Sequence, residues 1–190
     1  MEPPTKERLI EAAALLFRQK GYDGVGLAEI LAAAKAPKGS LYHHFPNGKS
    51  DLALASAKWA SNGMLRIIDE AFADAQTFDE GATTLCHKIA KFFDISGGWD
   101  GCPVSSILLD GSGDLAFRDA LADYLETWVQ HAAALGMARG LSADEAERRA
   151  RLVMIGIQGA WVLCRAQSSA DPLRQLPDLL GLRTTAARTP

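Results

Sequence analysis

Apolar residues recur at helical spacing through the first 45 residues and predict three short helices. The first covers 5–20 and stops at Gly21, the second covers 27–34, and the third covers 38–44. Pro37 cannot continue the second helix, because it lacks an N–H and clashes with the preceding turn. We therefore expect a three-helix bundle whose second and third helices are joined by a tight turn. The apolar positions of the bundle are Leu9, Ala13, Leu16, Phe17, Leu27, Ile30, Leu31, Leu41 and Phe45.

The predicted helix 38–44 is apolar on one side, where Leu41 and Phe45 can anchor it, and polar on the other. A helix that presents a cation, hydroxyls and imidazoles on its outer side suits the major groove of DNA. On spacing alone, the histidines are explained equally well as solvated residues and the tyrosine as a core residue. The polar side chains are Lys38, Ser40, Tyr42, His43 and His44.

The rest of the chain also has helical patterns, with no internal repeat and no convincing strand. Ser142 and Glu145 have the spacing of a capping box at the start of one helix. The predicted fold class is therefore all-α, with about nine helices. A three-helix bundle is expected over 1–48 and a larger helical domain over 49–190. Further helices are expected over 49–75, 78–95, 104–109, 115–140, 142–166 and 172–182, with a glycine-rich loop over 96–103 and a break at Gly111 and Gly113.

Composition supports this picture, because alanine is abundant while aromatic and β-branched residues are sparse. The 190 residues are 48% hydrophobic, enough for a sizeable core. The net charge of −3 excludes a nonspecific polycation. Residues 1–50 nevertheless carry seven Lys and Arg against five Asp and Glu, a balance of +2, which leaves −5 for the remainder. A mildly basic head fits a nucleic-acid-facing end.

The polar N-terminus, with Pro3 and Pro4, does not have the pattern of a signal peptide. The longest apolar run, 152–164, has 13 residues and includes Gln158, so it is too short to span a bilayer. Three widely spaced cysteines indicate reduced thiols rather than a disulfide framework. We expect a cytoplasmic protein that has no contact with a membrane. The cysteines are Cys86, Cys102 and Cys164.

Patterns typical of enzymes and metal sites are incomplete. Residues 110–121 imitate a calcium loop but lack the glycine at its sixth position and the glutamate at its twelfth. Cys86, His87 and Cys102 do not complete a zinc ligand set. Gly111-Ser112-Gly113 lacks the outer spacing of a nucleophile elbow, and no glycine-rich phosphate loop is present. We expect no metal, no cofactor and no enzymatic activity.

A series of motifs runs in order and without gaps through the first 55 residues. It consists of Ile10-Glu11-Ala12-Ala13, Leu16-Phe17, Gly21-Tyr22, Ile30 with Ala33-Ala34, and Lys38-Gly39-Ser40-Leu41-Tyr42-His43-His44-Phe45 with Lys49. This series resembles the tetracycline-repressor (TetR) family of bacterial transcriptional regulators. Farther along, Gly101-Cys102-Pro103-Val104 is similar to the LmrA/YxaF-like subgroup of that family.

The resemblance implies a homodimer that binds double-stranded DNA through the helix 38–44. It also implies that 1–48 form a helix-turn-helix DNA-binding domain and that 49–190 form a helical domain for effector binding and dimerisation. Lys38, Ser40 and His43 would read bases, whereas Tyr42 and Lys49 would mostly meet phosphates, which position the protein without reading sequence. The residues expected to bind DNA are Lys38, Gly39, Ser40, Tyr42, His43, His44 and Lys49.

The chain departs from the family pattern at the start of the second helix. Family members usually have a Thr or Ser there, which caps the helix and touches a phosphate, whereas this chain has Gly26. Glycine is an acceptable N-cap residue, but it has no hydroxyl. One phosphate contact is therefore in question, while the fold is not.

The segment 152–164 is apolar almost all round, so it must be covered on more than one side. The middle of a large core would cover it, and so would a surface shared between the core and a second subunit, as the family's twofold dimer implies. Gly156 and Ala160 lie four residues apart and would let two helices approach closely. The expected dimer interface contains Gly156, Gly159, Ala160 and Leu163.

The resemblance also implies a pocket for a small effector in the helical body. Its candidate residues carry few charges, which favours an uncharged or amphipathic aromatic compound, although most are equally explained as plain core. The predicted function is a ligand-responsive repressor that binds a palindromic operator and is released by its effector. An activator with the same fold, or a small-molecule binding protein with a degenerate DNA-binding head, is the alternative. The pocket candidates are Phe72, Phe92, Phe93, Trp99, Leu109, Trp128, Met154, Gln158 and Trp161.

Overall fold

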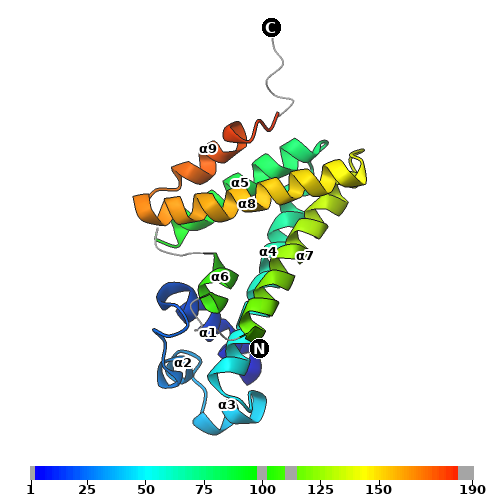
Figure 1. The fold of residues 1–190 in the computed structure, drawn as a ribbon. Helices are drawn as coiled ribbons and strands as arrows, with labels where there is room; N and C mark the ends of the chain where they lie inside the picture. Colours follow the sequence, from blue (N-terminus) through cyan, green and yellow to red (C-terminus); the bar gives the residue numbers. More distant parts are fainter. Residues whose placement is uncertain (1–2, 98–101, 110–114, 184–190) are drawn as a thin grey trace. The chain divides into compact units, whose positions relative to one another are not determined.

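The computed structural model describes residues 3–97, 102–109 and 115–183, and in these residues it contains nine α-helices and no strand (Figure 1). The all-α fold class is confirmed, and the predicted helix ends lie within three residues of the observed ones. The predicted break at Gly111 and Gly113 lies outside the described residues. The helices are α1 (Thr5–Lys20), α2 (Leu27–Ala33), α3 (Lys38–His44), α4 (Lys49–Phe72), α5 (Phe78–Ile95), α6 (Pro103–Leu108), α7 (Leu115–Met137), α8 (Ala143–Gln167) and α9 (Asp171–Leu179).

The chain folds into two compact units, and each unit is built from two separate stretches of sequence. The first unit combines Met1–Gly63 with Gly101–Tyr124, and the second combines Met64–Asp100 with Leu125–Pro190. Helices α4 and α7 each contribute residues to both units. By its contacts, the bundle predicted over 1–48 therefore belongs together with the first part of α4, with α6 and with the first part of α7. The functional boundary at residue 48 stays a prediction.

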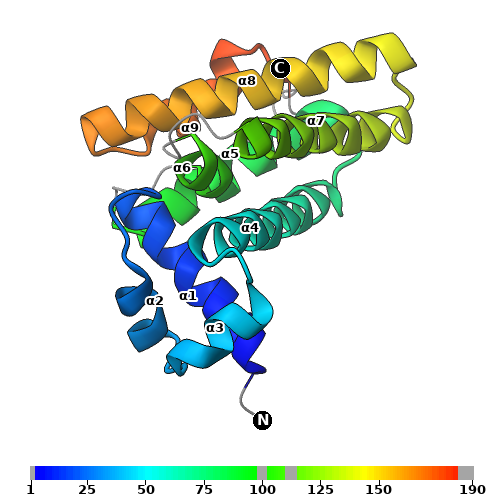
Figure 2. The same ribbon diagram turned by 60° about the horizontal axis from the view of Figure 1, so that its bottom comes forward.

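Helix α1 lies at the centre of the first unit. Leu9, Ala13 and Phe17 are completely buried, and α1 contacts α2, α3 and α6 (Figure 2). The hydroxyl of Ser56, which is itself buried on α4, donates a hydrogen bond of 3.2 Å to the backbone oxygen of Ile10. Burial on several sides fixes α1, and the other helices of the unit are positioned against it.

The turn of the helix-turn-helix is a Schellman motif, which reverses the chain at the end of a helix. The N–H of Ala36 bonds to the oxygen of Leu31 at 3.0 Å, and the N–H of Lys35 bonds to the oxygen of Ala32 at 3.2 Å. The motif requires a left-handed residue, usually glycine, but here Lys35 has a φ of 48°. The guanidinium of Arg8 donates to the oxygen of Ala34 at 3.1 Å and so joins this turn to α1.

In the second unit, α9 lies beside both α5 and α8 (Figure 1). The ends of α4 and α7 are joined by Arg139, whose guanidinium donates to the backbone oxygens of Phe72, Ala75 and Leu135. The Phe72 ring lies so close to Gly81 on α5 that a Cβ there would approach it to 2.3 Å. A glycine at this position therefore allows α5 to pack tightly against the end of α4.

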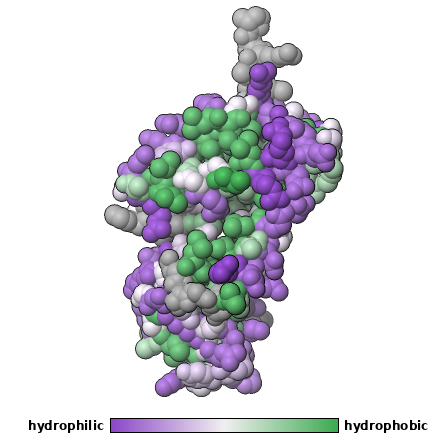
Figure 3. Space-filling view, in the orientation of Figure 1, coloured by the Kyte–Doolittle hydropathy of each residue, from purple (hydrophilic) through white to green (hydrophobic). Residues whose placement is uncertain are grey.

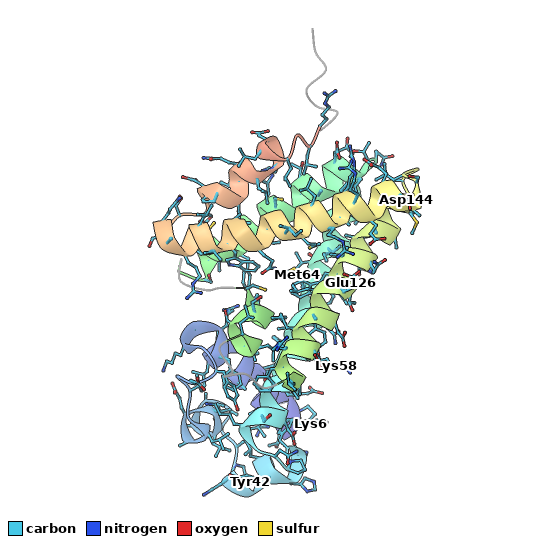
Figure 4. The ribbon with its side chains drawn as sticks, viewed as in Figure 1. Lys6, Tyr42, Lys58, Met64, Glu126 and Asp144 are labelled. Atoms are coloured by element: carbon cyan, nitrogen blue, oxygen red, sulfur yellow. The ribbon has the colours of Figure 1, made fainter. Side chains whose placement is uncertain are left out.

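Charged and capping contacts order the start of α8 and join it to α7. The Ser142 hydroxyl accepts a hydrogen bond of 3.3 Å from the Glu145 N–H, which is one of the two bonds of the predicted capping box. Arg151 on α8 donates to both carboxylate oxygens of Glu126 on α7 (Figure 4), at 2.9 and 3.0 Å. These bonds, with a further one from Gln130, lower the pKa of Glu126 to about 2. Glu126 therefore keeps its charge through the physiological pH range.

The three cysteines are buried and form no disulfide. Burial raises the pKa of Cys86 to about 12, and it raises the pKa of Cys164 as well. Both thiols are therefore protonated at neutral pH, and protonated thiols are poor nucleophiles. Among the helices of the described residues, none has the length and apolar character needed to cross a bilayer.

The left-handed Lys35 gives a prediction about stability. Lys35→Gly should raise the free energy of unfolding by about 0.5–1 kcal/mol, because glycine adopts this conformation without the penalty that a Cβ incurs. The expected rise in melting temperature is about 1–4 °C, measured by circular dichroism. Lys35→Ala removes the same charged side chain but keeps a Cβ, and it should give no such gain. Equal stabilisation by the two variants would contradict this explanation.

Candidate nucleic-acid interface

Helix α3 is held against the first unit from one side only. Leu41 is completely buried and Phe45 is 3% exposed, so the predicted anchors are confirmed. Lys38, Gly39 and His43 are exposed on its other side, and 48% of Tyr42 is exposed. Tyr42 lies on α3 at the outer edge of the unit (Figure 4). The accessible surface of α3, which we call the α3 face, therefore consists of Lys38, Gly39, Tyr42 and His43.

Ser40 has one of its hydrogen-bonding functions already engaged. Its hydroxyl donates to the backbone oxygen of Pro37 at 2.7 Å. Pro37 lies at the N-cap position, directly before α3, so this bond ties the side chain to the first turn. In this geometry Ser40 has only oxygen lone pairs left to offer, and these accept hydrogen bonds. Ser40 is thus presented to a partner as an acceptor.

Gly39 is a glycine that the fold of the chain does not require. It is helical, and a Cβ built on it meets nothing within 4 Å. Glycine inside a helix costs about 0.5–1 kcal/mol relative to alanine. Neither a left-handed conformation nor a close packing contact accounts for glycine at this position.

The two histidines of α3 have different surroundings. The His44 ring is half-buried, with its centroid 6.3 Å from that of Phe45, whereas His43 is exposed. Their own ring centroids are 4.9 Å apart. His43 is therefore the histidine better placed to meet a partner. In the part of the chain that the structure describes, no three His, Cys, Asp or Glu side chains are grouped as metal ligands would be.

A tight turn places Lys49 next to α3. Gly48 has a φ of +65°, a left-handed conformation that favours glycine, and it lies against the Tyr42 ring. The backbone N–H and the side-chain amide of Asn47 donate to the Asp51 carboxylate at 2.9 and 3.1 Å. These contacts fix the start of α4, whose first residue is Lys49. The Lys49 ammonium lies 4.3 Å from the centroid of the Tyr22 ring.

Gly26 occupies the N-cap position of α2, where the family pattern has a hydroxyl residue. Its φ of −90° and ψ of 149° are accessible to any residue, and a Cβ built there meets nothing within 4 Å. No side chain caps this end of α2. The departure from the family pattern at Gly26 therefore removes a capping side chain and its hydroxyl, while the backbone keeps an ordinary N-cap conformation.

The residues predicted for an effector pocket have mixed surroundings. Phe72 is explained by packing, because its ring contacts Gly81 and lies 5.6 Å from that of Phe78. Leu109 is 66% exposed, and Trp99 lies outside the described residues. Phe92 and Gln158 are half-buried. The buried members of the set are Phe72, Phe93, Trp128, Met154 and Trp161.

The residues predicted for a dimer interface divide between two sides of α8. Gly156 faces α9, where a Cβ would lie 3.0 Å from a methyl carbon of Leu176, and Ala160 is buried. Gly159 is exposed, and a Cβ there would meet nothing within 4 Å. Leu163 is 51% exposed. Intrachain packing thus explains Gly156 but does not explain Gly159.

An exposed apolar stripe runs along α8 through Gly159. It recurs every three or four residues, and this period is the signal by which the sequence alone could have revealed it. The stripe borders a groove of about 310 Å³ between α8 and α9, lined by Gly156, Ala160, Leu163, Leu176 and Leu179 among others. Apolar surface gathers over α8 and α9 (Figure 3). The α8 stripe consists of Leu152, Ile155, Gly159, Val162 and Leu163.

Two protein-family models match the chain, and together they cover most of it. Residues 9–55 match the DNA-binding domain of bacterial regulatory proteins of the tetR family. Residues 79–178 match the C-terminal domain of LmrA/YxaF-like transcriptional regulators. The first match contains the whole α3 face, and the second contains α8 and its stripe.

Individual proteins give the same picture. The transcriptional regulator AcuR of Cereibacter sphaeroides is 34% identical over 182 residues, which cover 92% of this chain and 83% of AcuR. A crystal structure of a TetR regulatory protein from Rhodobacter sphaeroides superimposes with a TM-score of 0.79 at 32% identity, covering 92% of this chain and 96% of that one.

A third similar structure contains DNA. It is a cysteine mutant of the TetR-family regulator CifR in complex with a 26-base-pair operator, with a TM-score of 0.77 at 22% identity, covering 92% of this chain and 93% of CifR. At that identity the likeness concerns the fold alone. The family and these relatives are transcriptional regulators rather than enzymes. The chain thus belongs to the TetR family of DNA-binding transcriptional regulators, with a C-terminal domain of the LmrA/YxaF-like type.

Proposed function

We propose that this regulator is a cytoplasmic repressor that binds a palindromic operator as a homodimer and is released by a small, largely apolar or aromatic effector. The observation that carries the DNA-binding part is the α3 face. It combines exposed cationic and polar side chains with Gly39, a helical glycine that the fold does not need. A bare backbone at the start of a recognition helix permits close approach to DNA.

The α3 face, together with Lys49 beside it, supports two kinds of contact with DNA: contacts that position the protein and contacts that read bases. Lys49 and Tyr42 would contact phosphates, whereas Lys38 and His43 would reach base edges. Ser40, presented as an acceptor, suits the amino groups of cytosine or adenine in the major groove. CifR, which has the same fold, has been crystallised on operator DNA, and this likeness supports the same use of the fold here.

The α8 stripe supports the homodimer. Ile155 is 64% exposed and Val162 is 68% exposed, and a second copy of the chain would cover this apolar surface. In a twofold dimer the stripe would pack against its own copy, and Gly159 would let the two helices approach closely. Two recognition helices in successive major grooves would then lie about 34–36 Å apart, which is the reason for a palindromic operator.

The effector would shift the dimer between two conformations by binding one of them more tightly. Apart from Phe72, which packing explains, the buried members of the predicted set favour an apolar or aromatic compound; they are Phe93, Trp128, Met154 and Trp161. An activator would use the same surfaces, and the position of the operator relative to a promoter distinguishes it from a repressor. A binding protein with a degenerate head would show no salt-dependent affinity for DNA.

The decisive experiment is selection of DNA from a random pool by the purified protein at moderate salt, followed by sequencing. An enriched inverted repeat is the expected result, and it provides the probe for screening aromatic compounds by release of the protein. Binding that disappears between low and moderate salt, without an enriched motif, would overturn the proposed operator binding.

Gly39→Ala should move stability and DNA affinity in opposite directions. Alanine favours the helix and meets nothing inside the chain, so the free energy of unfolding should rise by about 0.5–1 kcal/mol. The added methyl group would occupy the space in which the backbone meets DNA, so operator affinity should fall by about tenfold or more. Ala32→Gly, an exposed change on α2, should lower stability and leave affinity unchanged. Undiminished binding by Gly39→Ala would show that this part of α3 does not approach DNA.

Substitutions on the α3 face and at the neighbouring Lys49 should separate contacts that position the protein from contacts that read bases. Lys49→Ala should weaken binding to all sequences and reduce the salt slope by about one unit, whereas Lys38→Ala and His43→Ala should change the preferred operator. Fluorescence anisotropy with specific and scrambled DNA measures both effects. Lys58→Ala removes the same charge about 13.5 Å farther along α4 and should change neither. Equal losses on both DNAs for all three variants would refute the division.

Gly159→Leu should convert the dimer to monomers without unfolding the chain. A Cβ at this position meets nothing within 4 Å, and the leucine side chain would hold two α8 helices apart. Analytical ultracentrifugation measures the change, and the helical circular dichroism signal should persist. Lys91→Leu places the same side chain at an exposed site on α5 and should leave the dimer intact. A wild-type monomer, or a dimeric Gly159→Leu variant, would exclude this interface.

A further inference from the structure

The Lys49 side chain is not free to sample the solvent around the start of α4. It is half-buried, and its ammonium lies 4.3 Å from the centroid of the Tyr22 ring. At this distance the positive charge is attracted by the negative face of the aromatic ring. Both residues belong to the first unit. The contact connects Lys49, which is proposed to bind a phosphate, with Tyr22 in the segment between α1 and α2.

The Tyr22 ring is itself fixed from two directions. Phe17 of α1 lies against it with ring centroids 5.6 Å apart and planes tilted by 38°. Phe117 of α7 meets it edge to face, with centroids 5.2 Å apart and planes at 87°. Phe17 is completely buried and Phe117 is 1% exposed, so neither phenylalanine can readily move away. Tyr22 therefore forms a rigid platform that α1 and α7 support together.

A lysine held on such a platform is prepared for phosphate binding. An unrestrained lysine loses much of its rotamer freedom when it binds, and this loss weakens the contact. The Tyr22 ring restricts the side chain beforehand. Because the ammonium has three N–H donors and only one side of it faces the ring, donors remain for phosphate oxygens. Restraint before binding strengthens a contact without adding a new one.

We propose that Tyr22 is a positioning residue for Lys49, and that its ring, supported by Phe17 and Phe117, holds the ammonium where a DNA phosphate meets it. This inference rests on the proposed operator binding and deepens it. It makes a residue outside the α3 face, and the first part of α7 behind it, a determinant of DNA affinity. Tyr22 acts through Lys49 and need not touch DNA.

A double-mutant cycle tests the proposal on the full-length protein. Tyr22→Leu keeps an apolar side chain against Phe17 and Phe117 but removes the aromatic face, so operator affinity should fall by about threefold to tenfold. Tyr22→Phe keeps the face and should bind within about twofold of the wild type. In the Lys49→Ala background, Tyr22→Leu should cause no further loss, because the side chain that it positions is already absent.

The cycle also separates this inference from the proposed function. Independent losses from Tyr22→Leu and Lys49→Ala, with normal binding by the wild type, would overturn the positioning role alone. So would an equal loss in Tyr22→Phe. A wild type with no salt-dependent affinity for DNA would overturn the proposed operator binding and the positioning role together.

A measurement on the wild type guards against variants that fail to fold. The ring current of Tyr22 should shift the ε-methylene protons of Lys49 upfield in the proton NMR spectrum, and the shift should persist in Tyr22→Phe. Lys58, exposed on the same helix, provides the unshifted reference. If the ε-methylene protons of Lys49 had the same chemical shift as those of Lys58, the proposal would be overturned without any substitution.

Discussion

Helix α1 buries Leu9, Ala13 and Phe17 completely and contacts α2, α3 and α6 at once. A helix of 16 residues is marginal by itself in water, so these contacts hold the first unit together. They also fix the orientation of α3. Because Leu41 and Phe45 are buried in the core, the polar side chains of α3 face outward. Because α6 contacts α1, as α2 and α3 do, the segment 101–124 belongs to the first unit as much as α2 or α3.

Patterns of neighbouring residues in the sequence predicted the helices well, but they did not predict contacts between residues that are far apart in the sequence. The bounds of α3 followed from Pro37 and from the spacing of Leu41 and Phe45. The left-handed turn residue was missed because glycine is its usual signal, and the chain has Lys35 there. The contact between Tyr22 and Phe117 joins residues far apart in sequence, and no periodic pattern carries that information. Aromatic character alone placed Phe72 among the pocket candidates, although its contacts with Gly81 and Phe78 explain it as core.

The glycines show how far a sequence pattern can be interpreted before the fold is known. Gly156 and Gly159 were grouped together as small residues on one helix, but one faces Leu176 inside the chain and the other faces outward. Gly48 is favoured by its positive φ. Gly39 and Gly159 have neither a positive φ nor a close packing contact, and both lie inside helices, where glycine is unfavourable. Only the three-dimensional structure distinguishes a glycine that the fold needs from one that it does not need.

The division of the first unit into two stretches of sequence also affects how the protein is made. Chains are synthesised from the N-terminus at about 5–20 residues per second, so Tyr124 follows Gly63 by on the order of 3–12 seconds. During that interval α1 lacks its contact with α6, and Tyr22 lacks its contact with the ring of Phe117. The nascent helix-turn-helix therefore exposes apolar surface that the finished protein buries, and chaperones can bind it. A ribosome that stalls in this interval would release a fragment that contains the whole α3 face but lacks the helices that complete its core.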